Sequence, residues 1–441
     1  MKKSITIAMS FVGLIVGAGF ASGQEMIQYF VSFGQIGFVG AIMASAIMII
    51  AGIATLELGS YYLAGEHTAV FDRTFHPITS KFIDASIVFT LFAVGFVMFA
   101  GAGSNLQQQF GLPIWVGALL MMVLVLISGL LDVERLTEVI GTVTPFIIGF
   151  VVFAGVVSAM HMPSDLTPLN EASQQLTHPM SHWIISSLNY VGLSLITAVS
   201  MSIVIGGSHL DPKVAGRGGM IGGVLYTLLL LVATGALFIN VETVGHADLP
   251  MLELVNSIHP WAGVAMALVI FAMIYNTAVG MFYALGKRLT RNHPKRFFPV
   301  YAVAVLVGFG LSFAGFKSLV SMVYPIVGYI GIFLAFLMAW YWFNGRKKIN
   351  QEAQRREKMR ELLARKLDPR RRFTRRHRQE LHSMTEESHM DNKTLSEAVV
   401  DELDADESVN FSKDDAGSDL GKEFSSGERD IAARPSGSKQ K

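Results

Sequence analysis

The chain has 441 residues, of which 51% are hydrophobic and only 16% are charged, and its mean hydropathy is +0.46. It contains no cysteine, which excludes a disulfide scaffold, a thiol enzyme and a cysteine-ligated metal site. Residues 1–343 hold 13 of the 35 Lys and Arg and 14 of the 34 Asp and Glu, so the remaining residues hold 22 and 20. A body this poor in charge is not typical of a soluble enzyme.

Ten apolar segments are long enough to cross the roughly 30 Å apolar core of a bilayer as helices. They do not alternate apolar and polar residues, so barrel strands are excluded. The first segment follows Met1-Lys2-Lys3 but continues past residue 23, which indicates a span rather than a signal peptide. The segments are 5–32, 37–60, 82–103, 113–130, 139–160, 183–207, 218–240, 260–285, 297–315 and 318–343. We therefore predict an all-α polytopic membrane protein with a ten-helix transmembrane domain over residues 1–343.

Lys and Arg are concentrated in the connections on one side of these ten spans. The other side carries Lys317 alone. Because basic residues favour the cytoplasmic side and the number of spans is even, both termini are predicted to be cytoplasmic. The basic residues of the inner side are Lys2, Lys3, Arg73, Lys81, Arg135, Lys213, Arg217, Lys287, Arg288, Arg291, Lys295 and Arg296.

The second half of the apolar region repeats the first at an offset of 180 residues, which is the separation of Pro145 and Pro325. Five spans in each half would make the second half enter the membrane from the opposite side, as in the inverted repeats of secondary transporters. The alternative is a chance coincidence of two prolines. In the inverted-repeat architecture, the first helix of each half is interrupted, so we predict that the first and sixth helices are discontinuous.

The first segment contains four glycines between Gly13 and Gly23. Glycine weakens a helix and permits other backbone conformations. A break near residues 17–21 would free carbonyl groups near Gly13–Gly17 for a cation and N–H groups near Ala21–Gly23, including Ser22, for a carboxylate. These groups together suit a zwitterion and a coupling ion. The alternative is close helix packing through small residues such as Gly17 and Ala21.

Glu25 follows these glycines directly and has two interpretations. Ser22 and Glu25 have the spacing of a capping box, in which each side chain accepts a hydrogen bond from an unpaired N–H group. An acidic residue inside a span is also costly and usually functional, so Glu25 is a candidate to carry a proton or to pair with a cation.

Two further spans contain polar clusters. Asn189, Tyr190 and Ser194 in the sixth segment stand where the repeat predicts the partner half of a substrate site. Asn276 and Thr277 in the eighth segment are explained equally by interhelical hydrogen bonds and by cation coordination. The spans contain no metal-ligand spacing and no nucleophile–base pair, so we expect no enzyme, no cofactor and no metal beyond a coupling Na⁺.

Residues 344–441 form a charged tail that is basic over 346–378 and acidic over 391–430. Such composition predicts a largely disordered cytoplasmic extension, with a helix around 351–366. The basic stretch next to the last span would attract anionic lipid headgroups. It lacks interleaved aromatic residues, so nucleic acid is not expected as a partner.

The motif VGAGFASGQE at 16–25, with Gly13 before it, resembles the YkvI-type amino-acid permeases of bacteria. These belong to the amino acid–polyamine–organocation superfamily, whose members have the leucine-transporter (LeuT) fold. The resemblance covers residues 1–343. It implies ten helices in a 5+5 inverted repeat and a plasma-membrane symporter for an amino acid or similar small zwitterion. Transport would be driven by Na⁺ or H⁺ and would proceed by alternating access.

The resemblance also implies roles for individual residues. The carbonyl groups of Gly13 and Val16, with the hydroxyl of Thr277, would form a sodium site. The N–H groups of Ala18 and Gly19 would hold the substrate carboxylate, and the region 190–194 would hold its amino group and side chain. This chain has Phe20 where sodium-coupled members carry Asn, which leaves proton coupling through Glu25 open.

Two other classes of function share this hydropathy. A channel or facilitator would need no coupling ion, although the chain has no ring of charges and no filter loop. A membrane sensor or scaffold would act through the tail, and the polar helix breaks would then have no transport role.

Overall fold

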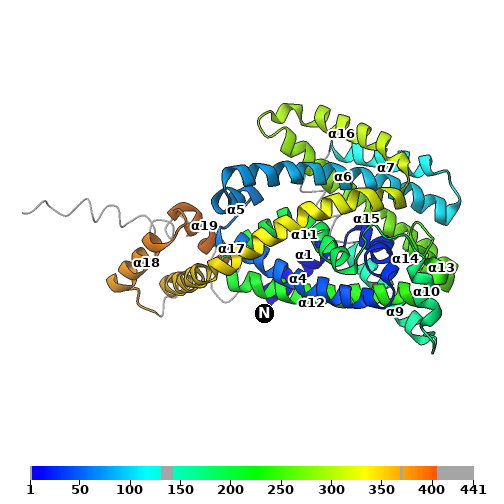
Figure 1. Ribbon diagram of the computed structural model, residues 1–441. Helices are drawn as coiled ribbons and strands as arrows, with labels where there is room; N and C mark the ends of the chain where they lie inside the picture. The colour runs from blue at the N-terminus through cyan, green and yellow to red at the C-terminus, as the bar shows by residue number, and fades with distance from the viewer. Residues whose placement is uncertain (1, 131–142, 368–370, 405–441) are drawn as a thin grey trace, which may run out of the picture.

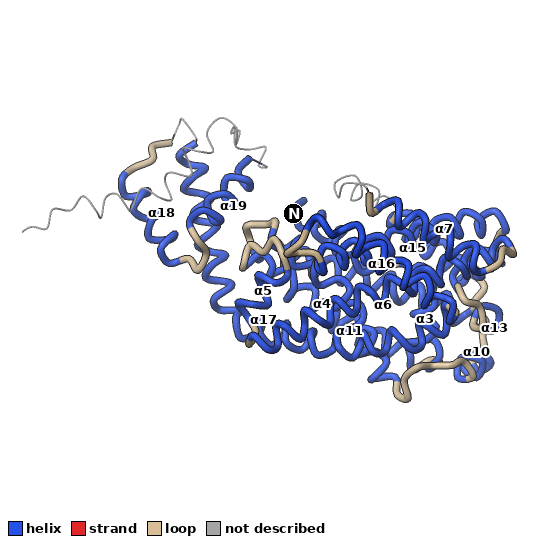
Figure 2. The backbone as a smooth tube through the Cα atoms, turned by 90° about the horizontal axis from the view of Figure 1, so that it is seen from above, coloured by secondary structure: helices blue, strands red, loops and turns tan. Residues whose placement is uncertain are grey.

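The computed structural model describes residues 2–130, 143–367 and 371–404, and every regular element within these ranges is a helix. The helices form an elongated bundle, and α18 and α19 lie beyond one end of it (Figures 1 and 2). We call that end the tail side and the other end the opposite side. Four predicted features lie outside the described residues: Arg135, the first residues of the segment 139–160, Arg370 and the acidic stretch beyond residue 404.

Within the described ranges, seven helical segments are long and apolar enough to cross a membrane, judged by length and composition. They correspond to seven of the ten predicted spans. Two other predicted spans are represented by the shorter apolar helices α7 (Ile114–Ser128) and α9 (Thr144–Met160). Six of the seven are single helices: α4 (Ile36–Tyr61), α6 (Pro77–Phe110), α11 (Trp183–Gly207), α12 (Pro212–Ile239), α15 (Pro260–Leu289) and α17 (Phe316–Leu367). The seventh, Pro294–Ala314, consists of η2 (Pro294–Arg296), α16 (Phe297–Leu311) and η3 (Ser312–Ala314).

The first predicted span is divided into α1 (Lys2–Ile15), α2 (Ala18–Ser22) and α3 (Gln24–Tyr29). At the first interruption, Gly17 has an extended backbone and its N–H group bonds to the carbonyl of Ile15 at 2.8 Å, two residues back. At the second, Gly23 has a φ of 79°, a left-handed conformation that favours glycine. The glycine-rich segment is therefore interrupted, as its composition predicts.

The predicted break in the sixth span is wrong, because α11 is continuous from Trp183 to Gly207. The glycine in the middle of α11, Gly192, serves helix packing instead. A Cβ atom on Gly192 would overlap the backbone of α17 at Gly328 and Gly331. Small residues in membrane helices allow such close approach, and a single glycine does not interrupt the hydrogen-bond ladder of a helix.

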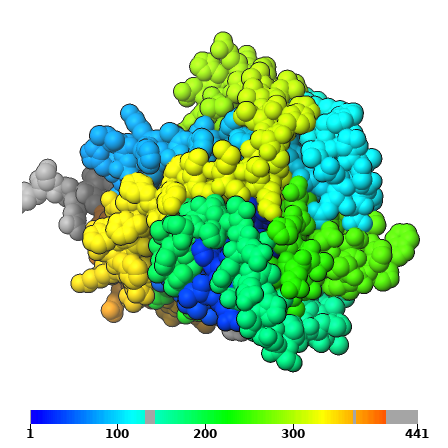
Figure 3. All heavy atoms as spheres, turned by 45° about the vertical axis from the view of Figure 1, so that its right-hand side comes forward, coloured from blue at the N-terminus to red at the C-terminus, as the bar shows by residue number. Residues whose placement is uncertain are grey.

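The long helices pack in two groups. In the first, α1, α4, α11 and α12 contact one another, and in the second α6, α7, α15 and α16 do so. Helix α17 contacts both α11 and α6 and so lies between the groups. Short elements complete the connections: η1 (Val31–Phe33), α5 (His67–Thr74), α10 (Thr167–Gln174), α13 (Val241–Val244) and α14 (Pro250–Ile258). In Figure 3, which brings the opposite side forward, green and yellow segments cover most of the blue N-terminal chain.

The described part of the tail, residues 344–367 and 371–404, is mainly helical, whereas its composition indicated a largely disordered extension. Helix α17 continues beyond its apolar part to Leu367, and α18 (Arg375–Glu387) and α19 (Asn392–Asp404) pack against this extension. Despite its many charges, α19 repeats apolar residues at helical spacing, and these bury a second apolar cluster. The buried members of this cluster are Leu210, Met359, Leu363, Leu381, Met390, Leu395, Val399, Val400 and Leu403.

Candidate functional site

A cavity of about 590 Å³ begins at the break in the first span and extends to the tail side. Its wall is formed by α1, α2, α3, α6, α11, α15 and α17, together with the connection between α4 and α5. Its far end is lined by Gly65–His67 and by Lys287, Arg288 and Arg291, all at the tail side. Among the described residues, no lining residue comes from the connections of the opposite side.

The interrupted backbone of the first span forms the inner end of this cavity, where Gly13 through Gly19 line it. The first intrahelical bond of α2 runs from Ala21 N to Gly17 O at 3.0 Å. The N–H groups of Ala18 and Gly19 precede that bond, so they have no partner within their own helix. Likewise, the last carbonyl groups of α1 have no N–H partner within α1. The break therefore presents both donors and acceptors of the main chain to the cavity.

Glu25 is the acidic residue at this inner end, and it also lines the cavity. Its carboxyl group lies against Gly19, where a Cβ atom would overlap it. Within the described residues, no side chain forms a hydrogen bond or an ion pair with Glu25. A carboxylate withdrawn from water without a charged partner is energetically costly, which favours a proton or a cation as its partner.

The capping-box interpretation of Ser22 and Glu25 is wrong. Helix α3 begins after Gly23, and no side chain caps it. The Ser22 hydroxyl instead donates to Gly19 O at 2.8 Å and accepts from Gln24 N at 3.2 Å. Ser22 therefore stabilises the link between α2 and α3, and Glu25 is left facing the cavity.

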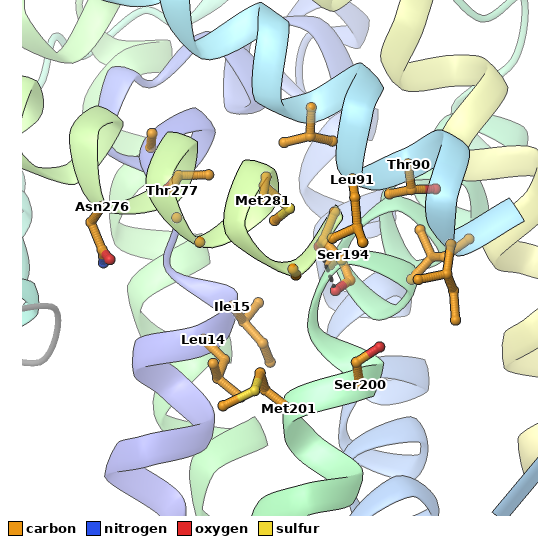
Figure 4. Close-up of a pocket in the computed structure, with 18 of the residues that line it drawn as sticks. Leu14, Ile15, Thr90, Leu91, Ser194, Ser200, Met201, Asn276, Thr277 and Met281 are labelled. Atoms are coloured by element: carbon orange, nitrogen blue, oxygen red, sulfur yellow. Dashed lines mark hydrogen bonds between the residues drawn. The ribbon is translucent and has the colours of Figure 1, made fainter. Parts of the chain in front are cut away.

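The cavity wall away from the break is mainly apolar. Figure 4 shows Thr277 and Met281 of α15, Ser194, Ser200 and Met201 of α11, and Leu14 and Ile15 of α1 around one space. Thr90 of α6 also lines it, although its hydroxyl is used in a bond to Ser86 O at 2.8 Å. An apolar wall with a few polar groups is typical of a site for a small organic ligand. The apolar lining residues include Ile87, Leu91, Val94, Met98, Leu193, Ile196, Met273 and Met281.

Charged residues surround the mouth of the cavity at the tail side. Arg288 forms an ion pair with Asp84, and Arg291 Nη2 lies 3.7 Å from Glu66 Oε2. His67 is packed beside them, with its Nε2 atom 4.0 Å from Asp84 Oδ1. Burial, and secondarily the charge of Arg288, lower the pKa of His67 to about 4, so this imidazole is neutral at pH 7. These pairs link α15 to α6 and to the α4–α5 connection.

Of the fourteen residues predicted to form the site, the structure brings nine together around the cavity. These are Gly13, Val16, Gly17, Ala18, Gly19, Glu25, Ser194, Asn276 and Thr277. Ala21 and Ser22, which end α2, and Gly23, which joins α2 to α3, are not among the residues that line the cavity. Asn189 and Tyr190 also lie outside it.

Asn189 and Tyr190 take part in contacts between helices. The Asn189 amide donates to Pro325 O of α17 at 2.9 Å and accepts from the Tyr29 hydroxyl at 3.1 Å. Tyr190 shares a hydrogen bond with Tyr226 of α12. Because α11 is unbroken, these two side chains lie one turn before the lining residues Leu193 and Ser194, and they tie α11 to its neighbours beyond the inner end of the cavity.

The sequence reasoning missed the mouth residues and most of the apolar wall. On α15, the lining residues Met273, Thr277, Met281 and Ala284 recur every three or four positions. The same spacing appears on α6 and α11, so a single polar residue on each span would have identified the rest of its helical face. The mouth gave no such signal, because its ion pairs join residues about 200 positions apart.

No protein-family model matches the chain. It is 26% identical to the uncharacterized membrane protein YkvI of Bacillus subtilis (strain 168) over 339 residues, which cover 76% of this chain and 94% of YkvI. It is 23% identical to the uncharacterized protein YyaD of the same organism over 331 residues, 75% of this chain and 94% of YyaD. Among solved structures, the inward-facing conformation of Mhp1 matches with a TM-score of 0.50 at 13% identity, over 78% of this chain and 77% of that chain. The chain is thus a multi-pass membrane protein with a LeuT-like fold.

Proposed function

We propose that this protein is a secondary active transporter that moves an amino acid or a similar small zwitterion together with Na⁺ or H⁺. The observation that carries this proposal is a cavity that ends at a helix break beside the carboxyl group of Glu25. Among the described residues, this carboxyl group has no side-chain partner, and the cavity is lined at one end of the bundle only. The LeuT-like fold supports it, since transporter folds place substrate sites at interrupted helices near the middle of the membrane.

The chemistry of the inner end suits a zwitterion. The N–H groups at the start of α2, around Ala18 and Gly19, would receive a carboxylate, and Ser194 lies on the facing wall. The carbonyl groups of Gly13 and Val16, with the side chains of Thr277 and Asn276, would receive the coupling cation. Glu25 would either bind that cation or carry the proton. Ala21, Ser22, Gly23, Asn189 and Tyr190 would act indirectly, by holding α2, α3 and α11 in place.

The proposed mechanism is alternating access in a ten-helix body of two inverted halves, with the tail side in the cytoplasm. The described basic residues of the expected inner loops support this orientation, because they fall at the tail-side ends of the helices. The cavity is then open inward. On the outward side, the bonds from Tyr29 to Asn189 and from Asn189 to Pro325 tie α3 and α11 to α17. Transport would require these contacts to open while the mouth closes.

We also propose where the tail meets anionic lipid. Arg346 lies over the Trp342 ring at 4.7 Å, next to the end of the apolar part of α17, and Lys347 and Lys348 follow it. The later basic cluster, 371–378, comes after α17 has run about 30 Å further as a helix. The first group is therefore the one placed to contact headgroups.

Transport by reconstituted protein tests the proposal. Purified protein in proteoliposomes is given an imposed Na⁺ or H⁺ gradient and a panel of radiolabelled amino acids and other zwitterions. Accumulation above the equilibrium level, abolished by dissipating the gradient, is the expected result. Uptake that stops at equilibrium would favour the facilitator, and no uptake of any zwitterion would overturn the proposed substrate class.

A further inference from the structure

A buried arginine fixes the extension of α17 to the transmembrane body. Arg356 is fully buried, and its guanidinium donates to Ser60 O at 2.8 Å, to Tyr61 O at 2.7 Å and to Leu210 O at 3.2 Å. The first two carbonyl groups are among the last of α4, where the helix provides no partners of its own. The third lies in the connection between α11 and α12. A residue of the tail thus completes the hydrogen bonding of two connections of the body.

The charge of Arg356 is balanced by Glu352, whose Oε1 lies 3.0 Å from Arg356 Nε. Burial alone would raise the pKa of Glu352, but a hydrogen bond with His389, the charge of Arg356 and the hydrogen bond from Ser388 lower it to about 2. Glu352 also accepts from the Ser388 hydroxyl at 2.6 Å. Through the hydrogen bond from Ser388, Glu352 therefore joins the extension of α17 to the segment between α18 and α19.

The segment between α18 and α19 packs against the α4–α5 connection. The ring of His389 stacks on Tyr61 at the end of α4, with ring centres 4.1 Å apart, and Arg73 of α5 contacts the sulfur of Met390 at 3.5 Å. Leu63, which has a φ of 45°, packs against the apolar cluster of the tail. Gly65–His67 follow directly and line the cavity mouth. The tail therefore supports one wall of that mouth.

Helix α19 also reaches the first half of the broken span. Lys3 Nζ, at the start of α1, lies 2.6 Å from Glu402 Oε1 of α19. The contact is incompletely packed, because a cavity of about 370 Å³ lies beside it, between Lys3, His209 and Glu402. The other end of α1 is the interruption at Gly17, where Gly13–Ile15 line the transport cavity. Helix α1 is thus held by α19 at one end and by an irregular backbone at the other.

We propose that α18 and α19 form an autoregulatory clamp that restrains α1 and the α4–α5 connection in the arrangement that leaves the mouth open. Closing the mouth requires these walls to approach α15, and α1 can turn about its break only if Lys3 separates from Glu402 or carries α19 with it. Release of α19 therefore favours closure of the mouth. The clamp concerns the opening of the cavity and does not depend on which solute the cavity binds.

The absence of native cysteine provides a direct measurement of this opening. A single Ser200→Cys reporter on the cavity wall is introduced into the full-length chain, and its rate of alkylation by a water-soluble maleimide is measured in detergent. We expect Glu402→Lys, which places a second positive charge beside Lys3, to slow alkylation several-fold. The exchanged pair Lys3→Glu with Glu402→Lys should restore the parent rate.

Two further variants separate release of the clamp from other effects. Glu397→Lys makes the same charge change on the exposed face of α19 and should leave the rate unchanged. Val399→Ser weakens the apolar contact of α19 without changing charge and should slow alkylation as Glu402→Lys does. An unchanged rate in both Glu402→Lys and Val399→Ser, in variants that melt at the parent temperature, would overturn the clamp. So would equal slowing by Glu397→Lys.

Discussion

The carboxyl group of Glu25 occupies the space that a side chain at residue 19 would need. Gly19 lies in α2 and Glu25 in α3, so this contact spans the second interruption of the first helix. It places the acidic group next to the main-chain donors of α2 and inside the cavity. The site therefore depends on a glycine for space as well as for backbone freedom.

Replacement of Gly19 tests this contact. Gly19→Ala would displace the Glu25 carboxyl group or distort α2, so we expect transport to fall by about tenfold or more, equivalent to about 1.4 kcal/mol. Uptake in proteoliposomes at matched protein amounts measures the loss. Gly310→Ala in α16, where an added Cβ meets open space, is the matched control and should transport at the parent rate. Normal uptake by Gly19→Ala would contradict the placement of Glu25.

The charge of Glu25 is tested by Glu25→Gln, which keeps the shape of the side chain. Because the cavity gives this carboxylate no protein partner among the described residues, we expect the variant to lose gradient-driven accumulation and the dependence of uptake on external pH. The exposed acid Glu242, replaced in Glu242→Gln, serves as the control and should keep both. A parental pH profile in Glu25→Gln would assign the residue a structural role.

The buried pair of Arg356 and Glu352 makes a prediction about stability. Arg356→Met would leave Glu352 buried without the guanidinium and would remove the hydrogen bonds from Arg356 to three carbonyl groups, so we expect a loss of about 3–5 kcal/mol. Arg355, the adjacent and more exposed residue, pairs with Glu352 and Glu387. Arg355→Met should cost no more than about 1 kcal/mol. Thermal unfolding in detergent compares the two, and equal melting temperatures would refute the anchoring role of Arg356.

His67 predicts a loss of stability in acid. Its pKa is about 4 in the packed mouth against about 6.5 in an unfolded chain, so the folded state binds the proton less well. The proton equilibrium of His67 therefore leaves the free energy of unfolding unaffected above pH 6.5. It lowers that free energy as the pH drops toward 4, by at most about 3 kcal/mol. We expect the difference in melting temperature between pH 7.5 and pH 5 to shrink in His67→Gln. In His293→Gln, at an exposed histidine, it should stay at the parent value.

Local patterns in the sequence were sufficient to predict the interrupted first helix. The glycines at 17 and 23 adopt conformations that a helix interior does not contain, and Glu25 follows them within the cavity. The sixth span could not be assigned in the same way. Whether Gly192 breaks α11 or packs against α17 depends on Gly328 and Gly331, which are more than 130 residues away.

The sequence by itself determined the helical membrane body, because apolar runs of bilayer length have few other stable arrangements. It also located the interrupted helix, since glycine acts on the backbone of its own segment. Only the tertiary structure decided which polar residues meet in the cavity and that the described part of the tail folds onto the body. Both depend on contacts between distant segments: Asn189 turns toward Pro325, Arg288 toward Asp84, and Lys3 toward Glu402. The sequence shows that these residues are polar or charged, but which residues they contact depends on how the helices pack.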